Sequence, residues 1–151
     1  MGSNKKSIWS VIILIASIIS LVLFVSALVI LIVGVPATRN IAYQAAIDAG
    51  ETEDVANVIA ITAMVTVIVV FAISSVFDVL KIIGGFLFSL KGKWGIFCIV
   101  VSIIGAVGSV VGLVNAIRNH SGAGTIVIDS LTLAVDALLV VACFKHRAEL
   151  K

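Results

Sequence analysis

Two carboxylates inside an apolar segment are the residues most able to do chemistry in this sequence. Asp129 and Asp136 lie seven positions apart in the apolar run at residues 125–144. Thr125 lies four positions before Asp129, and Thr132 lies between the two acids, three positions after Asp129 and four before Asp136. In a helix, all four side chains would form one polar stripe. A carboxylate at the centre of a membrane helix costs on the order of 2–3 kcal/mol or more. The stripe is therefore expected to face protein or water and not lipid.

Two uses of these acids remain open from the sequence. In the first, Asp136 is protonated, because a lone charge is poorly solvated in a membrane, and it bonds a serine hydroxyl or a backbone carbonyl of another helix. In the second, Asp129 near the outer surface and Asp136 at mid-depth pass a proton or a cation in two steps, with Asp78 at the inner exit. The first is a packing role and the second is transport.

The motifs of soluble enzymes are missing from the sequence. It contains no Gly-x-x-x-x-Gly-Lys-Ser/Thr loop, no His-Glu-x-x-His, no Cys-x-x-Cys and no Gly-x-Ser-x-Gly. His120 and His146 are expected at opposite membrane surfaces, where they cannot converge. The acids at positions 48, 51, 53 and 54 lack the spacing of a calcium loop and instead indicate a helix that begins after Thr52. We therefore predict that the chain is not an enzyme and has no catalytic site, cofactor or metal.

Composition places the chain in a membrane. Of its 151 residues 62% are hydrophobic and only 12% are charged, whereas soluble domains carry roughly 25% charged residues. The mean hydropathy is +1.31. The net charge of +2 is too small to indicate a nucleic-acid partner. The sequence predicts an all-α polytopic membrane protein, one domain over residues 1–151, with the lipid bilayer as its surroundings.

Four apolar segments are long enough to span a bilayer, at residues 8–33, 55–79, 95–117 and 125–144. The first would be about 39 Å long as a helix, more than the hydrocarbon thickness, so it must tilt or protrude. It is also too long for the core of a signal peptide and is taken as a retained helix. Because each connection is too short to cross the membrane, the expected fold is an antiparallel up-down bundle of four helices.

Glycine and proline predict where these helices end. Gly34 and Pro36 are expected to end the first helix, and residues 40–49 to form a short separate helix stopped by Gly50. Gly84 and Gly85 are expected to end the second helix, leaving the apolar residues 86–90 in the membrane interface. The third helix is expected to begin next to Trp94.

Small residues indicate how the helices pack. A row with spacings of four and three follows the third span, Gly108 adds a Gly-x-x-x-Gly pair, and Ser10, Ser17 and Ser20 recur on the first span. Such faces let helix backbones approach closely in lipid. We expect the polar stripe to dock on Ser102 and Ser109, and the protein to assemble with itself or with a partner membrane protein. The predicted packing seam comprises Cys98, Ser102, Gly105, Gly108, Ser109, Gly112 and Ala116.

Charge predicts the topology. With four spans, both termini and the second connection share one side, which holds eight of the ten Lys and Arg residues. By the positive-inside rule this side is cytoplasmic, and Trp9 and Trp94 are then anchors at the inner interface. The lack of a separate targeting segment favours a bacterial plasma membrane.

Four further residues have ordinary roles predicted from their positions. Asp78 and Lys81 lie three positions apart, which favours a local ion pair on the helix surface. Cys98 and Cys143 are expected near the cytoplasmic ends of their helices, as free thiols that pack like small hydrophobic side chains.

Overall fold

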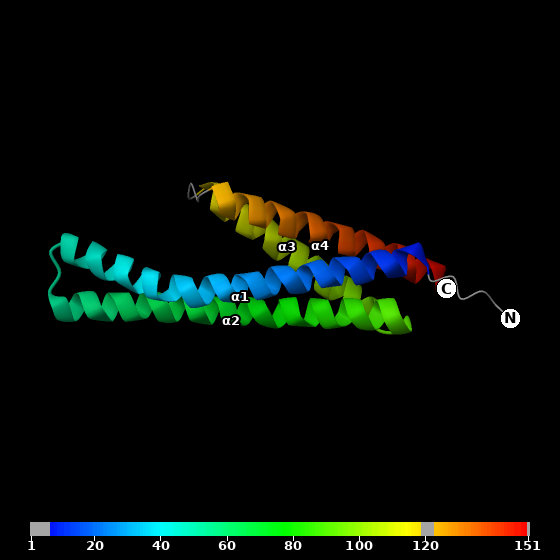
Figure 1. Ribbon diagram of the computed structural model, residues 1–151, viewed down its shortest axis with the longest axis horizontal. Coiled ribbons are helices and arrows are strands. Elements are labelled where there is room, and N and C mark those ends of the chain that lie inside the picture. The colour runs from blue at the N-terminus through cyan, green and yellow to red at the C-terminus, as the bar shows by residue number, and fades with distance from the viewer. Residues whose placement is uncertain (1–6, 119–122, 151) are drawn as a thin grey trace. The chain divides into compact units, whose positions relative to one another are not determined.

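The protein consists of four long helices. The computed structural model describes residues 7–118 and 123–150. The helices are α1 (Ile8–Asp48), α2 (Glu53–Lys91), α3 (Gly95–Arg118) and α4 (Ala123–Glu149), and no strand occurs in those ranges (Figure 1). Each helix is long and apolar enough to cross a membrane. The predicted all-α fold with four membrane-spanning helices is confirmed.

Helix α1 extends beyond the predicted end at Gly34 and Pro36. It continues to Asp48 with Pro36 inside it, so the separate helix at residues 40–49 is also wrong. A proline removes one backbone donor, but an apolar surrounding offers no water to compete for the remaining helical bonds. The Thr38 hydroxyl adds a bond of 3.0 Å to the carbonyl of Gly34.

The first true helix end is at Gly50. This glycine has a φ of 88°, and its N–H donates to the carbonyl of Ile47, while the N–H of Glu51 donates to the carbonyl of Ala46. These two bonds form a Schellman cap, which requires the left-handed backbone that glycine adopts readily. The next helix begins at Glu53, directly after Thr52, as the sequence predicts.

Helix α2 passes through Gly84 and Gly85 and ends at Lys91, so the prediction that these glycines end the helix is wrong. Both are buried, and they serve packing. A Cβ atom at Gly85 would collide with Oγ of Ser17, and one at Gly84 would lie 3.2 Å from the ring of Phe97. Residues 86–90 are therefore the last turns of α2 and not an interfacial loop. Gly92, with a φ of 63°, follows the end of the helix.

The chain divides into two compact units. The hairpin unit, Phe24–Val76, contains the second half of α1 and the first part of α2. Its helices approach at small residues, since Ala46, Ala56 and Ala60 are buried, and the rings of Phe24 and Phe71 stack at 6.5 Å. The prediction of a single domain stays a prediction.

The core unit contains the described residues of 7–23 and 77–150. In it, α3 and α4 pack as an antiparallel pair against the start of α1 and the end of α2 (Figure 1). The Ser7 hydroxyl bonds the Glu149 carboxylate, so the two ends of the described chain lie together, as an even number of spans requires. Which side of a membrane they occupy stays a prediction. The buried centre comprises Ile13, Ala16, Phe88, Cys98, Ile99, Leu139, Ala142 and Cys143.

Candidate functional site

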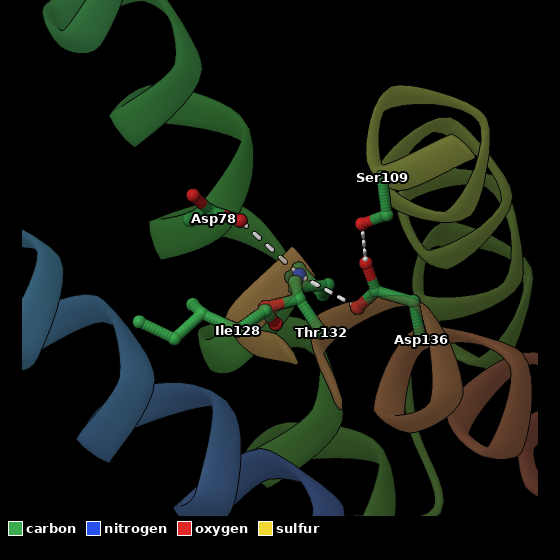
Figure 2. Close-up of polar contacts among 6 residues, drawn as sticks. Asp78, Ser109, Ile128, Thr132 and Asp136 are labelled. Carbon is green, nitrogen blue, oxygen red and sulfur yellow. Dashed lines mark hydrogen bonds and ion pairs between the residues drawn. The ribbon is translucent and has the colours of Figure 1, made fainter. Parts of the chain in front are cut away.

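The polar stripe of α4 is buried at one end only. Asp136 is 1% exposed, whereas Asp129 and Thr132 are half-buried and Thr125 is exposed. The Thr132 hydroxyl donates to the carbonyl of Ile128, one turn back on its own helix, at 2.9 Å (Figure 2). The four residues therefore do not form one buried face. Asp136 alone among them lies in the interior of the core unit.

Both carboxylate oxygens of Asp136 accept short hydrogen bonds. Oδ1 lies 2.7 Å from Nζ of Lys81, and Oδ2 accepts from Oγ of Ser109 at 2.7 Å (Figure 2). Distances of this size are typical of charge-assisted bonds. The predicted contact between the stripe and Ser109 is confirmed. In this geometry Lys81 and the Ser109 hydroxyl are the donors. The hypothesis that Asp136 is protonated stays a prediction.

Lys81 is the partner of Asp136 that the sequence analysis did not indicate. It is 4% exposed, and its ammonium lies 3.1 Å from Oδ1 of Asp78 as well as against Asp136. The predicted local pair of Asp78 and Lys81 is confirmed, but its placement on the helix surface is wrong for the lysine. The Asp78 side chain is 42% exposed. One ammonium thus joins a carboxylate at the edge of the core unit to a carboxylate in its interior.

A glycine of α3 makes room for this ammonium. A Cβ atom at Gly105 would lie 3.2 Å from Cδ of Lys81, 3.5 Å from its Nζ and 3.5 Å from Oδ2 of Asp136. The predicted small-residue seam thus has a specific use here, because a larger side chain at position 105 would displace the lysine. The rest of the seam divides in two: Cys98, Ser102 and Ala116 are buried, whereas a Cβ atom at Gly108 or Gly112 would meet nothing within 4 Å.

The network of Asp78, Lys81, Ser109 and Asp136, called here the ion-pair network, combines one basic and two acidic side chains. Buried ions lose their hydration, and only good geometry with additional hydrogen bonds offsets that loss. Asp136 meets this condition, since each oxygen has its own donor. Removing one partner of such a pair costs about 3–5 kcal/mol, because it leaves a buried charge uncompensated.

The two cysteines form a second buried contact between α3 and α4. The Sγ atoms of Cys98 and Cys143 lie 2.7 Å apart, and both residues are fully buried. Both are free thiols, as predicted. His146 is also buried, with its ring 4.8 Å from that of Phe88. Within the described ranges, no three His, Cys, Asp or Glu side chains lie together as metal ligands. His120 lies outside the described residues.

The two tryptophans differ in their surroundings. Trp9 is half-buried and packs against the buried centre of the core unit. Trp94 is 58% exposed, and its indole meets the ring of Phe97 edge-on at 5.4 Å. Their predicted role as anchors at the inner membrane interface stays a prediction.

Comparison of the chain with protein-family models, curated proteins and solved structures gives no match. The functional argument therefore begins from the geometry of the ion-pair network and the faces of the helices.

Proposed function

We propose that this chain is a multi-pass membrane protein that assembles with a second copy of itself, or with a partner membrane protein, through small-residue helix faces. The observation that carries the proposal is the open space around two glycines of α3. A Cβ atom at Gly108 or at Gly112 would meet nothing within 4 Å. Glycine inside a helix costs roughly 0.5–1 kcal/mol relative to alanine. A contact with another chain gives these two glycines a use that packing within this chain does not.

The ion-pair network supports the same proposal. Asp136 is 1% exposed and has its two oxygens bonded by Lys81 and Ser109, all from this chain. An intramembrane acid marks a functional site until its partner is found. The contacts with Lys81 and Ser109 support a structural role for Asp136 as a tie among α2, α3 and α4. The remaining surface of α3 is then available for assembly.

We place the protein in a cell membrane, as a bacterial plasma-membrane protein with both ends in the cytoplasm. The distribution of charge supports the orientation: Lys91, Lys93, Lys145 and Arg147 all lie at or near the end of α2 or of α4, and Ser7 bonds Glu149 at the end of α4. Modification of single introduced cysteines by a membrane-impermeant thiol reagent tests this orientation.

Energy transfer between labelled copies tests the assembly. Donor- and acceptor-labelled chains are mixed in liposomes and diluted with lipid. The double variant Gly108→Leu/Gly112→Leu is expected to weaken association about tenfold or more, because bulky side chains separate the backbones. The matched control is Val107→Leu/Val114→Leu, at exposed positions of the same helix. Equal association of the wild type and the glycine variant would rule out the proposal that the chain self-assembles through this face of α3. For a partner protein, the same two variants are compared for retention of one identified co-purifying protein.

Transport of protons or cations is the second candidate, and the ion-pair network favours it in one respect. Asp78, partly exposed, contacts Lys81, and Lys81 contacts the buried Asp136. Asp129, half-buried, has no ion-pair or hydrogen-bond partner among the described residues. Such a line of ionisable groups resembles the start of a relay. Liposome flux decides: equal proton and cation flux for wild type and Asp136→Ala would exclude this function.

A further inference from the structure

A pocket of about 710 Å³ lies at the end of the core unit where α2 ends, α3 begins and α4 ends. This volume is within the range of sites that bind small molecules. Most of its lining is apolar and aromatic, including Phe88, Trp94, Ile96, Phe97 and Leu150. Among the described residues of the lining, Arg147 is the one with a charged side chain.

Arg147 has no counter-ion in the described part of the chain. It is half-buried, and no carboxylate lies within ion-pair distance of it in residues 7–118 and 123–150. The nearest acid in sequence, Glu149, is bonded by the Ser7 hydroxyl and lies 3.8 Å from Nδ1 of His146. A guanidinium that is partly removed from water gains from an anion, and its planar donors match a phosphate. The pocket therefore offers an anion site beside an apolar surface.

The backbone of Trp94, one of the lining residues, is strained. Trp94 has a φ of 70°, which for a residue with a side chain costs on the order of 1–2 kcal/mol. The indole of Trp94 lines the pocket and lies edge-on to the ring of Phe97. Gly95, the next residue, is required because a Cβ atom there would lie 2.8 Å from the ring of Phe88. Strain of this kind persists where the surrounding structure fixes it, and it occurs often at ligand sites.

The geometry points to a binding site for a membrane phospholipid with an anionic head group. The phosphate lies against Arg147, and one acyl chain lies along Trp94, Ile96 and Phe97 toward Val100. Three observations select this occupant: the lining is mostly apolar, its half-buried Arg147 has no counter-ion among the described residues, and the pocket lies at the ends of helices that are long and apolar enough to span a membrane. Lys91 and Lys93, both exposed on the adjoining turn, add positive charge outside the pocket. This inference does not depend on the proposed assembly.

Quenching of Trp94 fluorescence by brominated lipid tests the inference on the full chain. With Trp9→Phe in every sample, Trp94 is the only tryptophan, since the sequence has two. The chain is reconstituted in vesicles that contain phosphatidylcholine with brominated phosphatidylglycerol, or phosphatidylcholine with brominated phosphatidylcholine. We expect brominated phosphatidylglycerol to quench Trp94 with a relative affinity about fivefold higher than that of brominated phosphatidylcholine. This is the effect of about one cation at a membrane surface.

Two arginine variants and one matched control assign the effect to the pocket. Arg147→Gln is expected to remove the preference, and Arg147→Lys to retain part of it, because an ammonium keeps the charge but not the paired donors. Lys145→Gln removes the same charge from an exposed position outside the pocket lining and is expected to change the preference by less than about twofold.

Several outcomes would overturn the inference. Equal quenching by the two lipids in the wild-type chain would show that the pocket does not select an anion. Equal losses in Arg147→Gln and Lys145→Gln would reduce the effect to general surface charge. Reversal of the quenching by inorganic phosphate, at ionic strength matched with sodium chloride, would leave an anion site without an acyl chain. Retained selectivity in Arg147→Lys together with its loss in Arg147→Gln supports the site even if one variant folds poorly.

Discussion

The two halves of the α3–α4 pair follow the same sequence pattern but differ in what they bury. The half where α3 begins and α4 ends is called here the inner half, and the half where α3 ends and α4 begins is called the outer half. The inner half has fully buried side chains on both helices, among them Cys98, Ser102, Asp136 and Cys143. In the outer half, Ala116 is the one buried side chain among the described residues. A repeated small-residue pattern therefore permits close packing but does not by itself produce burial. Burial occurs where the ends of α1 and α2 complete the core unit.

The two acids of α4 show the same contrast. Asp136 lies in the inner half with two donors, and Asp129 lies one heptad away in the outer half with none among the described residues. On the same helix, a carboxylate is fully buried only where an ammonium and a hydroxyl meet it. The contrast predicts that substitutions in the inner half are costly and that equivalent substitutions in the outer half are tolerated.

The largest expected effect follows from removing the ammonium. Lys81→Leu leaves Asp136 buried without a counter-ion and should lower the free energy of unfolding by about 3–5 kcal/mol. The measurement is a detergent-denaturation titration followed by circular dichroism. The double variant Lys81→Leu/Asp136→Leu, which buries no charge, should recover most of the loss. Asp129→Leu is the outer-half control and should change stability by no more than about 0.5 kcal/mol. A small effect of Lys81→Leu alone would contradict the ion-pair network.

Oxidation of the two cysteines should act in the opposite direction. Copper(II) phenanthroline takes one electron from each thiol, the two protons pass to water, and the two sulfur atoms of Cys98 and Cys143 form one bond. Their contact at 2.7 Å requires little movement of α3 or α4. The bridge should raise the free energy of unfolding by about 2–4 kcal/mol, and a reductant should reverse the gain. The bridged peptides are identified by mass spectrometry, with Cys143→Ser as the control. Absence of the bridge under full oxidation would contradict the packing of the inner half.

A smaller effect is expected from filling a glycine of the seam. Gly105→Leu places a bulky side chain where a Cβ atom already lies 3.2 Å from Lys81, so it should cost about 1–3 kcal/mol. Gly112→Leu, in the outer half, meets no atom of this chain and should change the stability of dilute protein by about 0.5 kcal/mol or less. Equal costs for the two substitutions would show that the halves do not differ.

The sequence predicted the elements better than their ends. The apolar runs identified all four helices, because length and hydropathy are local properties. The ends at Pro36 and at Gly84 were wrong, because without competing water a helix continues through residues that stop it in soluble proteins. Gly50 ended its helix as predicted, since its left-handed cap is a local structure.

The site could be predicted in part. The contact between Asp136 and Ser109 followed from two helical repeats that face each other. The contact of Lys81 with Asp136 was not predicted. Asp78 lies three residues from Lys81, and a local ion pair with it was sufficient to explain a lysine at this position. Its second partner lies 55 residues away, and only the packing of α2 on α4 brings it near. A lysine one turn inside an apolar run, facing a mid-helix acid elsewhere, is the signal that would have indicated the pair.

The smallest expected effect separates a hydroxyl that joins two helices from one that does not. Ser109→Ala removes a bond from α3 to Asp136 and should cost about 0.6–1.7 kcal/mol, the range of hydrogen bonds between membrane helices. Thr132→Ser retains a hydroxyl that bonds its own helix and should be close to neutral, as should Thr132→Ala. The double variant Ser109→Ala/Lys81→Leu provides the coupling: because both residues bond the same carboxylate, their costs should not add. If the two stability costs simply add, Ser109 does not act through Asp136. The Ser109 hydroxyl would then stabilise only its own helix, as the Thr132 hydroxyl does.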